Sequence, residues 1–423
     1  MKICMLTNTY RPHVGGVARS VQTLVDQCRA AGHSVQVIAP SFPGDEHEAE
    51  LQVLRVPALQ RFNGSDFSVR VPIPNMIARR IEQFAPDVIH THHPFLLGDA
   101  ALRIAYQHDL PLVFTHHTLY ENYTHYVPFD SRTLKRFVVR LATDYANCCD
   151  AVIAPSQSVS ALLEERGVRT PISVIPTGID SAALASGDGP SFRAERGLPA
   201  DAFVVGHVGR LAPEKNLEFL AEAIARWLRD DRQRRFLLVG DGAMSIPLRR
   251  RFERAGVEDR VLACGKLTGQ TLSDAYAAMD LFAFASQTET QGMVLAEAMA
   301  AGLPVVALDG PGVRDVVGDR RNGRLLPAES DPTAFAEALA RAEDSATRAE
   351  WHTAACATAR DFDQVRCAAA VLELYRSVTL HERHPGDDWN WWQRLLGRVE
   401  AEWELISSKA DSATGSLRDR TGR

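Results

Sequence analysis

The sequence predicts an α/β protein built from two doubly wound parallel sheets in tandem. Short apolar runs alternate with amphipathic helical patterns, the alternation occurs twice, and a Gly- and Ser-containing connection at 176–190 separates the two halves. Apolar strands flanked by helices are typical of a parallel sheet covered on both faces. Two such sheets in one chain create a cleft between the carboxyl ends of their strands, where ligands of this architecture bind.

The first half contains six apolar runs that predict strands and four segments with helical periodicity. The strands are expected at 2–8, 34–40, 51–57, 87–92, 111–117 and 151–156. The helices are expected at 17–32, 74–85, 99–109 and 131–148. The first of these helices ends on Gly32, a residue type that favours helix termination.

The second half repeats the same alternation. Strands are expected at 203–210, 236–242, 261–266, 281–286 and 303–309. Helices are expected at 217–230, 272–279, 293–301 and 366–380. The helix at 293–301 is followed by Gly302 and Pro304, which stop it.

Composition excludes several classes of protein. The chain has 423 residues, 45% of them hydrophobic, and a net charge of −6, which argues against a general nucleic-acid binder. No stretch approaches the roughly 20 apolar residues that span a bilayer, and the apolar run near residue 1 is too short for a signal peptide. The seven cysteines lack a C-x-x-C pair, which predicts buried thiols in a reducing compartment. We expect a cytoplasmic protein, with contact to the inner face of the membrane left open.

The stretch "SQTETQGMVLAEAMAAGLP" at 286–304 places Glu297 within an apolar run, with Glu289 eight residues earlier. A loop that leads from a strand into a helix N-terminus presents free backbone N–H groups, which favour phosphates. Gly292 permits close approach of a ligand to the backbone. We expect Glu289 to point into the cleft and Glu297 to accept hydrogen bonds from a ribose diol. The alternative is that Glu297 is an exposed helix residue.

This pair of glutamates, followed by "EAMAAGLPVVA", resembles the signature of the retaining glycosyltransferases of family 4. That family has the GT-B fold, in which two Rossmann-like domains face each other across a cleft. Six further stretches resemble the family in the same order and together cover about residues 1–375. They are "NTYRPHVGGVARSVQTLVDQCRAAGHSVQVIAP", "SVIPTGID", "VGRLAPEKNLEFLAEAI", "VGDGAM", "LACGKLTGQTLSDAYAAMDLFAFAS" and "GPGVRDVVGDRRNGRLLP".

The resemblance implies a division into domains. Residues 1–178 would form the N-terminal acceptor domain and residues 179–365 the C-terminal nucleotide-sugar domain. Residues 366–385 would form a helix that returns to the first domain. Residues 386–423 lie outside the resemblance. They hold four of the six tryptophans, and their composition predicts a Trp-rich helix followed by a disordered tail.

The resemblance also implies roles for single residues. Arg210 and Lys215 would grip the donor diphosphate, which agrees with the ability of two cations to neutralise a departing phosphate. Without the resemblance, the favoured interpretation of the two side chains is that they are solvated residues that follow a strand. Glu289 would contact sugar hydroxyls near the reacting carbon, and Glu297 would hold the ribose. His117 would reach the donor sugar across the cleft, and His116 is the alternative if the alignment shifts by one residue.

Backbone and lining contacts are implied at eight further positions. Gln291, Gly292, Met293 and Val294 would contact sugar and phosphate through the backbone. Gly15 and Gly16 would close over the diphosphate, and Lys266 and Leu267 would line the base.

The chemistry implied by the resemblance is a same-face displacement that retains the configuration of the sugar. The departing phosphate oxygen would accept the acceptor's proton, so Glu289 has a positioning and electrostatic role. No obvious pair of carboxylates at glycosidase spacing competes with this mechanism. No metal and no other cofactor is expected. The donor expected from the family is UDP-glucose, with GDP-mannose or a galactose donor left open.

A cluster of histidines offers an alternative from another class of enzyme. Seven of the fourteen histidines lie between residues 90 and 125, and His90 and His92 form an H-x-H pair that suits zinc. Such a pair needs further ligands, and the second half offers no matching set. A metal-dependent hydrolase is therefore the weaker alternative, beside a nucleotide-sugar epimerase.

Two parts of the sequence bear on the identity of the acceptor. They are the segment "LVFTHHTLYENYTHYVP" and the helix expected at 131–148. The segment resembles the branch of the family that glucosylates diacylglycerol, which implies a lipid acceptor. The helix combines basic residues with apolar ones, which suits an anionic membrane surface or, equally, a core-facing helix with a solvated basic side. The second candidate is a soluble or polysaccharide-type sugar acceptor. The basic residues are Arg132, Lys135, Arg136 and Arg140, and the apolar ones are Leu134, Phe137, Val138 and Leu141.

Overall fold

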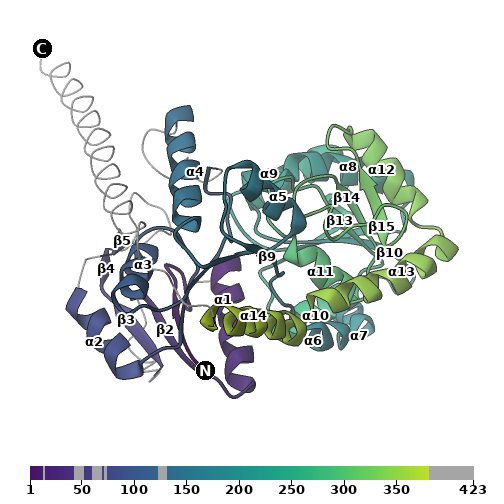
Figure 1. Cartoon of the computed structure of the whole chain (residues 1–423). Coiled ribbons are helices and arrows are strands. Elements are labelled where there is room, and N and C mark those ends of the chain that lie inside the picture. The colour runs from purple at the N-terminus through teal and green to yellow at the C-terminus, as the bar shows by residue number, and fades with distance from the viewer. Residues whose placement is uncertain (13–14, 42–51, 60–68, 71–73, 122–130, 381–423) are drawn as a thin grey trace, which may run out of the picture.

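The computed structural model describes residues 1–12, 15–41, 52–59, 69–70, 74–121 and 131–380. Figure 1 shows two lobes, each with a parallel sheet enclosed by helices, and the first and second halves of the chain form one lobe each. The predicted fold class, α/β with two Rossmann-like doubly wound domains, is confirmed.

The first sheet has seven parallel strands in the order β3-β2-β1-β6-β7-β8-β9. Its strands are β1 (Lys2–Leu6), β2 (Ser34–Pro40), β3 (Val53–Val56), β6 (Val88–Thr91), β7 (Leu112–Thr115), β8 (Ala151–Ala154) and β9 (Ile172–Val174). The first six correspond to the predicted strands. The seventh, β9, was not predicted because its three residues are too few to show a period. Two short strands, β4 (Ala58–Leu59) and β5 (Val69–Arg70), pair antiparallel in a separate ribbon.

Helices cover both faces of the first sheet. They are α1 (Gly16–Ala30), α2 (Pro74–Phe84), α3 (Leu97–Gln107), α4 (Arg132–Ala146) and α5 (Gln157–Glu165). Strand β1 packs on both faces of the sheet. Ile3 and Met5 belong to the hydrophobic core that the sheet forms with α1, whereas Cys4 and Leu6 belong to the core that it forms with α2 to α5. All four side chains are fully buried, as expected for a central strand of a doubly wound sheet.

The second sheet has six parallel strands in the order β12-β11-β10-β13-β14-β15. Its strands are β10 (Phe203–Val208), β11 (Arg234–Val239), β12 (Val261–Gly265), β13 (Leu281–Phe284), β14 (Val305–Leu308) and β15 (Gly323–Leu326). Its α-helices are α8 (Leu217–Asp230), α9 (Ser245–Ala255), α10 (Gly269–Ala277), α11 (Met293–Ala300), α12 (Pro332–Arg341) and α13 (Ser345–Ala359). Single 3-10 turns occur at η4 (Pro213–Lys215), η5 (Glu258–Arg260) and η6 (Arg360–Phe362).

The connection predicted at 176–190 is partly helical. Helix α6 (Ser181–Ala185) lies inside it, and α7 (Gly189–Glu195) begins inside it. Asp180 and Asp188 cap these two helices by accepting hydrogen bonds from backbone N–H groups at the helix starts. Both helices pack against α10, and the backbone N–H of Asp188 donates to Oδ1 of Asp274, so the connection is anchored to the second lobe from residue 180 onward.

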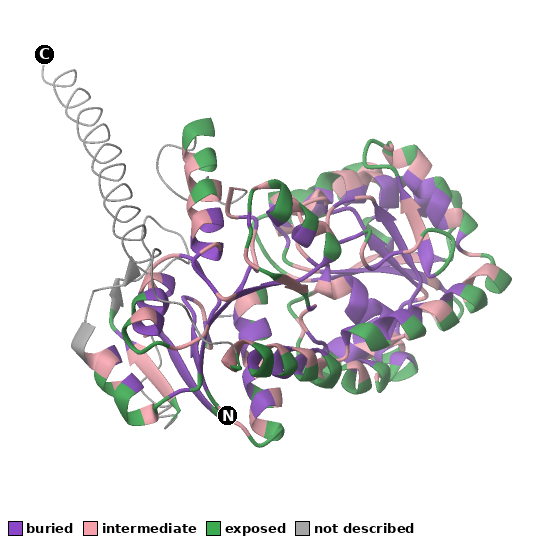
Figure 2. Cartoon of the chain, viewed as in Figure 1, coloured by how far each residue is buried: buried purple, intermediate pink, exposed green. Residues whose placement is uncertain are grey.

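Helix α14 (Gln364–Thr379) begins beside the second lobe and packs against α1 of the first lobe (Figure 1). Val371, Leu372 and Tyr375 contribute to the core of the first lobe, and the Tyr375 hydroxyl lies 2.5 Å from Nδ1 of His90. Figure 2 shows exposed residues along the outer side of this helix. The predicted Trp-rich tail, 386–423, lies outside the described residues.

Among the helices that the structure describes, none combines the length and the apolar character needed to cross a membrane.

Candidate functional site

The carboxyl ends of the two sheets meet at the loop that follows β13. Thr290 in this loop donates a hydrogen bond from Oγ1 to the backbone oxygen of His117, at 3.0 Å, and its own backbone oxygen accepts one from Oγ of Ser156, at 2.6 Å. Both partners follow strands of the first sheet, β7 and β8. The segment that contains Glu289 is therefore held against the first lobe.

Gln291 in the same loop ties the second lobe to the interdomain connection. Its side-chain oxygen accepts a hydrogen bond from the backbone N–H of Thr177 at 2.7 Å, and its side-chain nitrogen donates one to the backbone oxygen of Thr177 at 2.9 Å. The Gln291 side chain is almost fully buried. The sequence analysis expected the backbone of Gln291 to contact the sugar and phosphate. Its side chain has a structural role in addition, because it holds the interdomain connection.

Two glycines shape the turn that leads into α11. Gly292 has a φ of +72°, in the left-handed region that favours glycine, and it precedes the first helical residue, Met293. Gly312 also has a positive φ, and a Cβ there would lie 2.7 Å from the backbone nitrogen of Gln291. The loop therefore packs against bare backbone at Gly312.

Lys215 and Glu289, both predicted site residues, form an ion pair at the carboxyl end of the second sheet. Nζ of Lys215 donates to Oε1 of Glu289 at 2.6 Å, and both side chains are largely buried. Their segments follow the neighbouring strands β10 and β13, which explains the contact. Arg210 forms an ion pair with Glu214 and keeps about half of its side chain exposed. Two cations and one carboxylate of the predicted set thus lie at one sheet edge.

His207 lies beneath this pair, on β10. Its Nδ1 is 3.0 Å from the backbone oxygen of Ala283, and its ring stacks against those of Phe282 and Phe284. Burial lowers the pKa of His207 to about 4, so the imidazole is neutral at neutral pH. His207 therefore adds no positive charge beside Lys215 and Glu289.

Glu297 is buried inside α11, so the alternative of an exposed helix residue is wrong. Its Oε2 accepts a hydrogen bond from the Tyr276 hydroxyl at 2.9 Å, and its Oε1 lies 3.0 Å from Nη1 of Arg19 in the first lobe. A charged carboxylate in such a place requires partners. A hydroxyl and a guanidinium, from different lobes, supply them.

The histidines at the carboxyl edge of the first sheet form a hydrogen-bonded group. Nδ1 of His92 lies 2.9 Å from Nε2 of His117, and Nε2 of His90 lies 2.7 Å from Oγ1 of Thr115. Burial lowers the pKa of His92 and of His117 well below the ordinary value, with neighbouring histidines adding to the effect. Neutral imidazoles at this edge donate and accept hydrogen bonds without adding charge.

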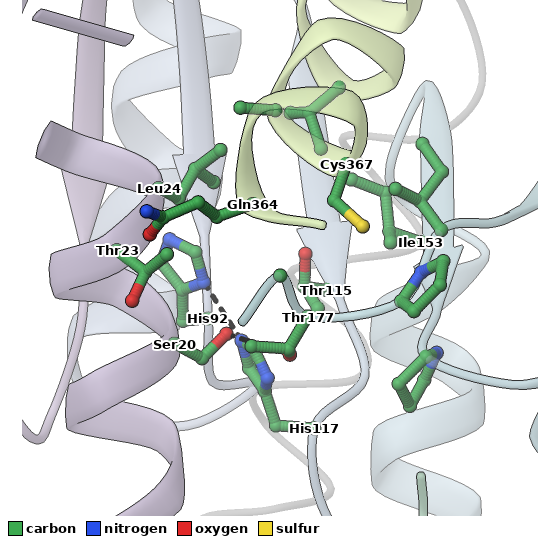
Figure 3. A pocket seen from close by; sticks show the side chains of 16 residues that line it. Ser20, Thr23, Leu24, His92, Thr115, His117, Ile153, Thr177, Gln364 and Cys367 are labelled. Carbon is green, nitrogen blue, oxygen red and sulfur yellow. Dashed lines mark hydrogen bonds between the residues drawn. The ribbon is translucent and has the colours of Figure 1, made fainter. Parts of the chain in front are cut away.

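Figure 3 shows the pocket that His92 and His117 help to line. Ser20 and Thr23 of α1 form one wall, and Gln364 and Cys367 of α14 form another (Figure 3). The pocket lies where the interdomain connection passes between the lobes, beside the edge that carries His117.

In the described residues, the structure places no three or more histidine, cysteine, aspartate or glutamate side chains in a group suited to a metal ion. The ring nitrogens of His90 are engaged by Thr115 and Tyr375, and Nδ1 of His93 accepts the backbone N–H of Asn8. Both ring nitrogens of His90 and Nδ1 of His92 are thus used within the protein, whereas Nε2 of His92 has no hydrogen-bond partner among the described residues.

The remaining predicted residues lie at the ends of their elements. Gly15 and Gly16 begin α1, one turn before Arg19. Met293 and Val294 form the first turn of α11, and Lys266 and Leu267 follow the edge strand β12. Among the described residues, no hydrogen bond or ion pair joins any of these six directly to Lys215 or Glu289. His116 is buried behind His117, next to Phe114 and Tyr120, so it is less well placed for a ligand than His117 is.

Sequence reasoning did not single out four residues that the structure places at the site: Arg19, Tyr276, Thr290 and Gly312. Three of them act through contacts between segments far apart in the chain. Gly312 carried a signal, because a second glycine in "GPG" indicates a backbone constraint.

Two family models match the chain. The model described as "Glycosyltransferase Family 4" matches residues 14–183, and the model described as "Glycosyl transferases group 1" matches residues 202–344. One match lies in each lobe.

Two relatives are similar over most of their length. An alpha-monoglucosyldiacylglycerol synthase of Streptococcus pneumoniae is 29% identical over 353 residues, which cover 81% of this chain and 79% of the relative. A GDP-mannose-dependent alpha-mannosyltransferase of Mycolicibacterium smegmatis is 32% identical over 348 residues, which cover 80% of this chain and 88% of the relative.

One solved structure, HepE of Anabaena in complex with UDP-glucose, matches both lobes. Its TM-score is 0.71 at 26% identity, and the match covers 89% of this chain and 100% of that chain.

Proposed function

The chain belongs to glycosyltransferase family 4, with the GT-B fold and the activity of a hexosyltransferase, and we propose that it transfers glucose from UDP-glucose to diacylglycerol with retention of configuration. The observation that carries the proposal is the Lys215–Glu289 pair at the carboxyl edge of the second sheet. It supplies a cation for the diphosphate and a carboxylate for the sugar within one contact.

On the donor side, Arg210 and Lys215 bind the diphosphate and neutralise the charge that develops as it departs. Arg210 keeps about half of its side chain exposed and is therefore accessible to a ligand. Because two cations take the role that a divalent metal has in other transferases, we propose that the reaction is independent of metal.

The transfer step is a same-face displacement. The bond between the anomeric carbon and the phosphate oxygen breaks, and the acceptor hydroxyl oxygen bonds to the same face of that carbon. The hydroxyl proton passes to the departing phosphate oxygen, so no protein base is consumed. Glu289 holds the sugar hydroxyls and stabilises positive charge at the reacting carbon, and His117 contacts the sugar from the first lobe as a neutral group.

The name of the pneumococcal relative, alpha-monoglucosyldiacylglycerol synthase, supports a lipid acceptor and a glucose donor. The UDP-glucose bound to HepE supports the same donor. The product would then be a glucosylated diacylglycerol, which remains in the membrane.

Helix α4 supports contact with a membrane surface. Its first half, residues 132–141, contains no buried residue, whereas Ala142, Thr143, Tyr145 and Ala146 are buried. Figure 2 shows the exposed end of α4 projecting from the first lobe. A core-facing role therefore explains only the second half of the helix. The first half presents half-buried apolar residues beside exposed cations, as an interfacial helix does.

A basic groove lies beside this helix. Five cationic side chains and two carboxylates line it, an excess that favours anionic headgroups. The cations are Lys135, Arg136, Arg140, Arg166 and Arg169, and the carboxylates are Glu121 and Asp144.

The test uses the purified chain, vesicles of phosphatidylglycerol that contain diacylglycerol, and radiolabelled UDP-glucose, with chelator present. We expect label in the organic phase, and an α-anomeric proton signal in the product. The Lys215→Ala variant is the matched inactive control. Label that stays in the aqueous phase, attached to a soluble acceptor, would contradict the lipid proposal. Loss of transfer on chelation would contradict the metal-independent mechanism.

GDP-mannose is the second candidate donor, because the mycobacterial relative at 32% identity is named for its dependence on it. The same assay with labelled GDP-mannose separates the two donors. Transfer from GDP-mannose alone would replace glucose by mannose in the proposal.

A further inference from the structure

An ion pair between the lobes closes off the carboxylate proposed to hold the ribose. Arg19 lies on α1 in the first lobe and Glu297 on α11 in the second, with Nη1 and Oε1 3.0 Å apart. The Arg19 side chain is 56% exposed, whereas that of Glu297 is only 2% exposed. The guanidinium therefore stands between solvent and the carboxylate.

The second carboxylate oxygen is also occupied. Oε2 of Glu297 accepts the hydroxyl of Tyr276, which is fully buried. A ribose diol cannot reach either oxygen while both partners are in place, because almost none of the carboxylate is accessible. Binding of a ribose to Glu297 therefore requires one partner to leave.

Arg19 is the partner that can leave. Its side chain is long and more than half exposed, so the guanidinium regains hydration when it swings into water. Tyr276 has no such path, because its ring is enclosed in the core of the second lobe. Ribose hydroxyls would then replace the guanidinium as hydrogen-bond donors to Oε1, while Tyr276 continues to hold Oε2.

We propose that Arg19 sets the nucleotide affinity of this enzyme by occupying the ribose position on Glu297 when the site is empty. The inference rests on the proposed function, since it takes Glu297 as the ribose ligand. Each nucleotide that binds through its ribose must break the ion pair, and its affinity is lowered by the strength of that pair. A nucleotide without ribose hydroxyls leaves the pair intact.

The experiment measures binding to the full-length chain by calorimetry, first with UDP and GDP. The diphosphate that binds the native chain is then compared with its 2′,3′-dideoxy analogue. In Arg19→Gln we expect the ribonucleotide to bind about fivefold more tightly, as befits loss of a partly exposed ion pair. The dideoxy analogue is expected to bind native and variant chains equally.

Matched variants separate this effect from a general loss of charge. Arg79→Gln removes an exposed arginine from α2 and is expected to change neither affinity. Arg19→Lys keeps a cation and is expected to retain part of the native behaviour. In a Glu297→Gln background, the Arg19→Gln change is expected to have no further effect.

Three results would overturn the inference. They are an unchanged ribonucleotide affinity in Arg19→Gln, equal tightening of both nucleotides, and weaker binding of both, which would make Arg19 a phosphate contact. Failure of the native chain to bind either UDP or GDP would instead contradict the proposed function, and the inference with it.

Discussion

Nζ of Lys215 lies 2.6 Å from Oε1 of Glu289, and this contact joins two segments that are 74 positions apart in the chain. The segments meet because β10 and β13 are neighbours in the second sheet and both end at the same edge. The pair is the point at which a diphosphate and its sugar would be held together.

Replacement of either member should abolish most turnover. We expect Lys215→Ala and Glu289→Ala each to lower kcat/KM by about 10²- to 10³-fold, the range for loss of one preorganised electrostatic contact to a transition state. Steady-state transfer of labelled sugar measures this. Glu329→Ala, an exposed residue of the same lobe, is the control. Near-native activity in either variant would remove that residue from the mechanism, provided that circular dichroism shows a folded chain.

The Gln291 side chain should stabilise the junction between the lobes. Gln291→Ala leaves the backbone N–H and oxygen of Thr177 without their partners, and we expect the free energy of unfolding to fall by about 1–3 kcal/mol. Urea denaturation measures the change. Gln270→Ala, at an exposed site on α10, is the comparison. Equal stability of the two variants would argue against a structural role for the Gln291 amide.

Stability should fall on mild acidification because of the buried histidines. Burial lowers the pKa of His90 and of His93 to about 3, and that of His116 to about 4, from the ordinary 6.5. Below pH 6.5 the unfolded chain takes up protons that the folded chain does not, so the stability present at neutral pH is lost as the pH falls toward these values. At pH 5 each fully buried histidine contributes a loss of about 2 kcal/mol.

Denaturation at pH 7 and at pH 5 tests this dependence. We expect His93→Gln to reduce the difference between the two pH values, whereas His108→Gln, at an exposed position, should leave it unchanged. An equal difference in all three proteins would mean that other groups cause the acid sensitivity.

Membrane binding should depend on the first half of α4. We expect the triple change of Lys135, Arg136 and Arg140 to glutamine to weaken sedimentation with phosphatidylglycerol vesicles by about fivefold for each charge removed, since a basic residue near such a surface contributes about 1 kcal/mol. The control is a variant in which Arg249, Arg250 and Arg254 on α9, which are also exposed, are changed to glutamine, and we expect it to bind the vesicles as the native chain does. A chain that ends at residue 385 tests the Trp-rich tail in the same assay. Loss of binding only in the shortened chain would move the contact from α4 to the tail.

Local pattern was sufficient for the elements that carry the site. The apolar run at 281–286 predicted β13. Gly292 and the apolar stretch that follows it predicted α11, and both elements form. These predictions succeed because the period of apolar residues and the conformational freedom of glycine act within a few residues. The composition of α11 also held evidence on Glu297. A helix that is apolar on all sides is buried, and its one charged residue is buried with it.

The sequence by itself therefore determined that the chain forms two parallel sheets, most of their strands and the segments that end at the cleft, whereas β9, β15 and helices α5, α9, α12 and α13 were not predicted. Only the tertiary structure decided which side chains pair: Lys215 with Glu289, Arg19 with Glu297, and Gln291 with Thr177. These pairings depend on how two separately folded lobes face each other, and on which charged groups burial forces to find a partner. Helix α4 is a further example of what the sequence left open, because its amphipathic pattern is compatible with packing against the core or with lying on a surface. Its position at the rim of the first lobe leaves its first half exposed.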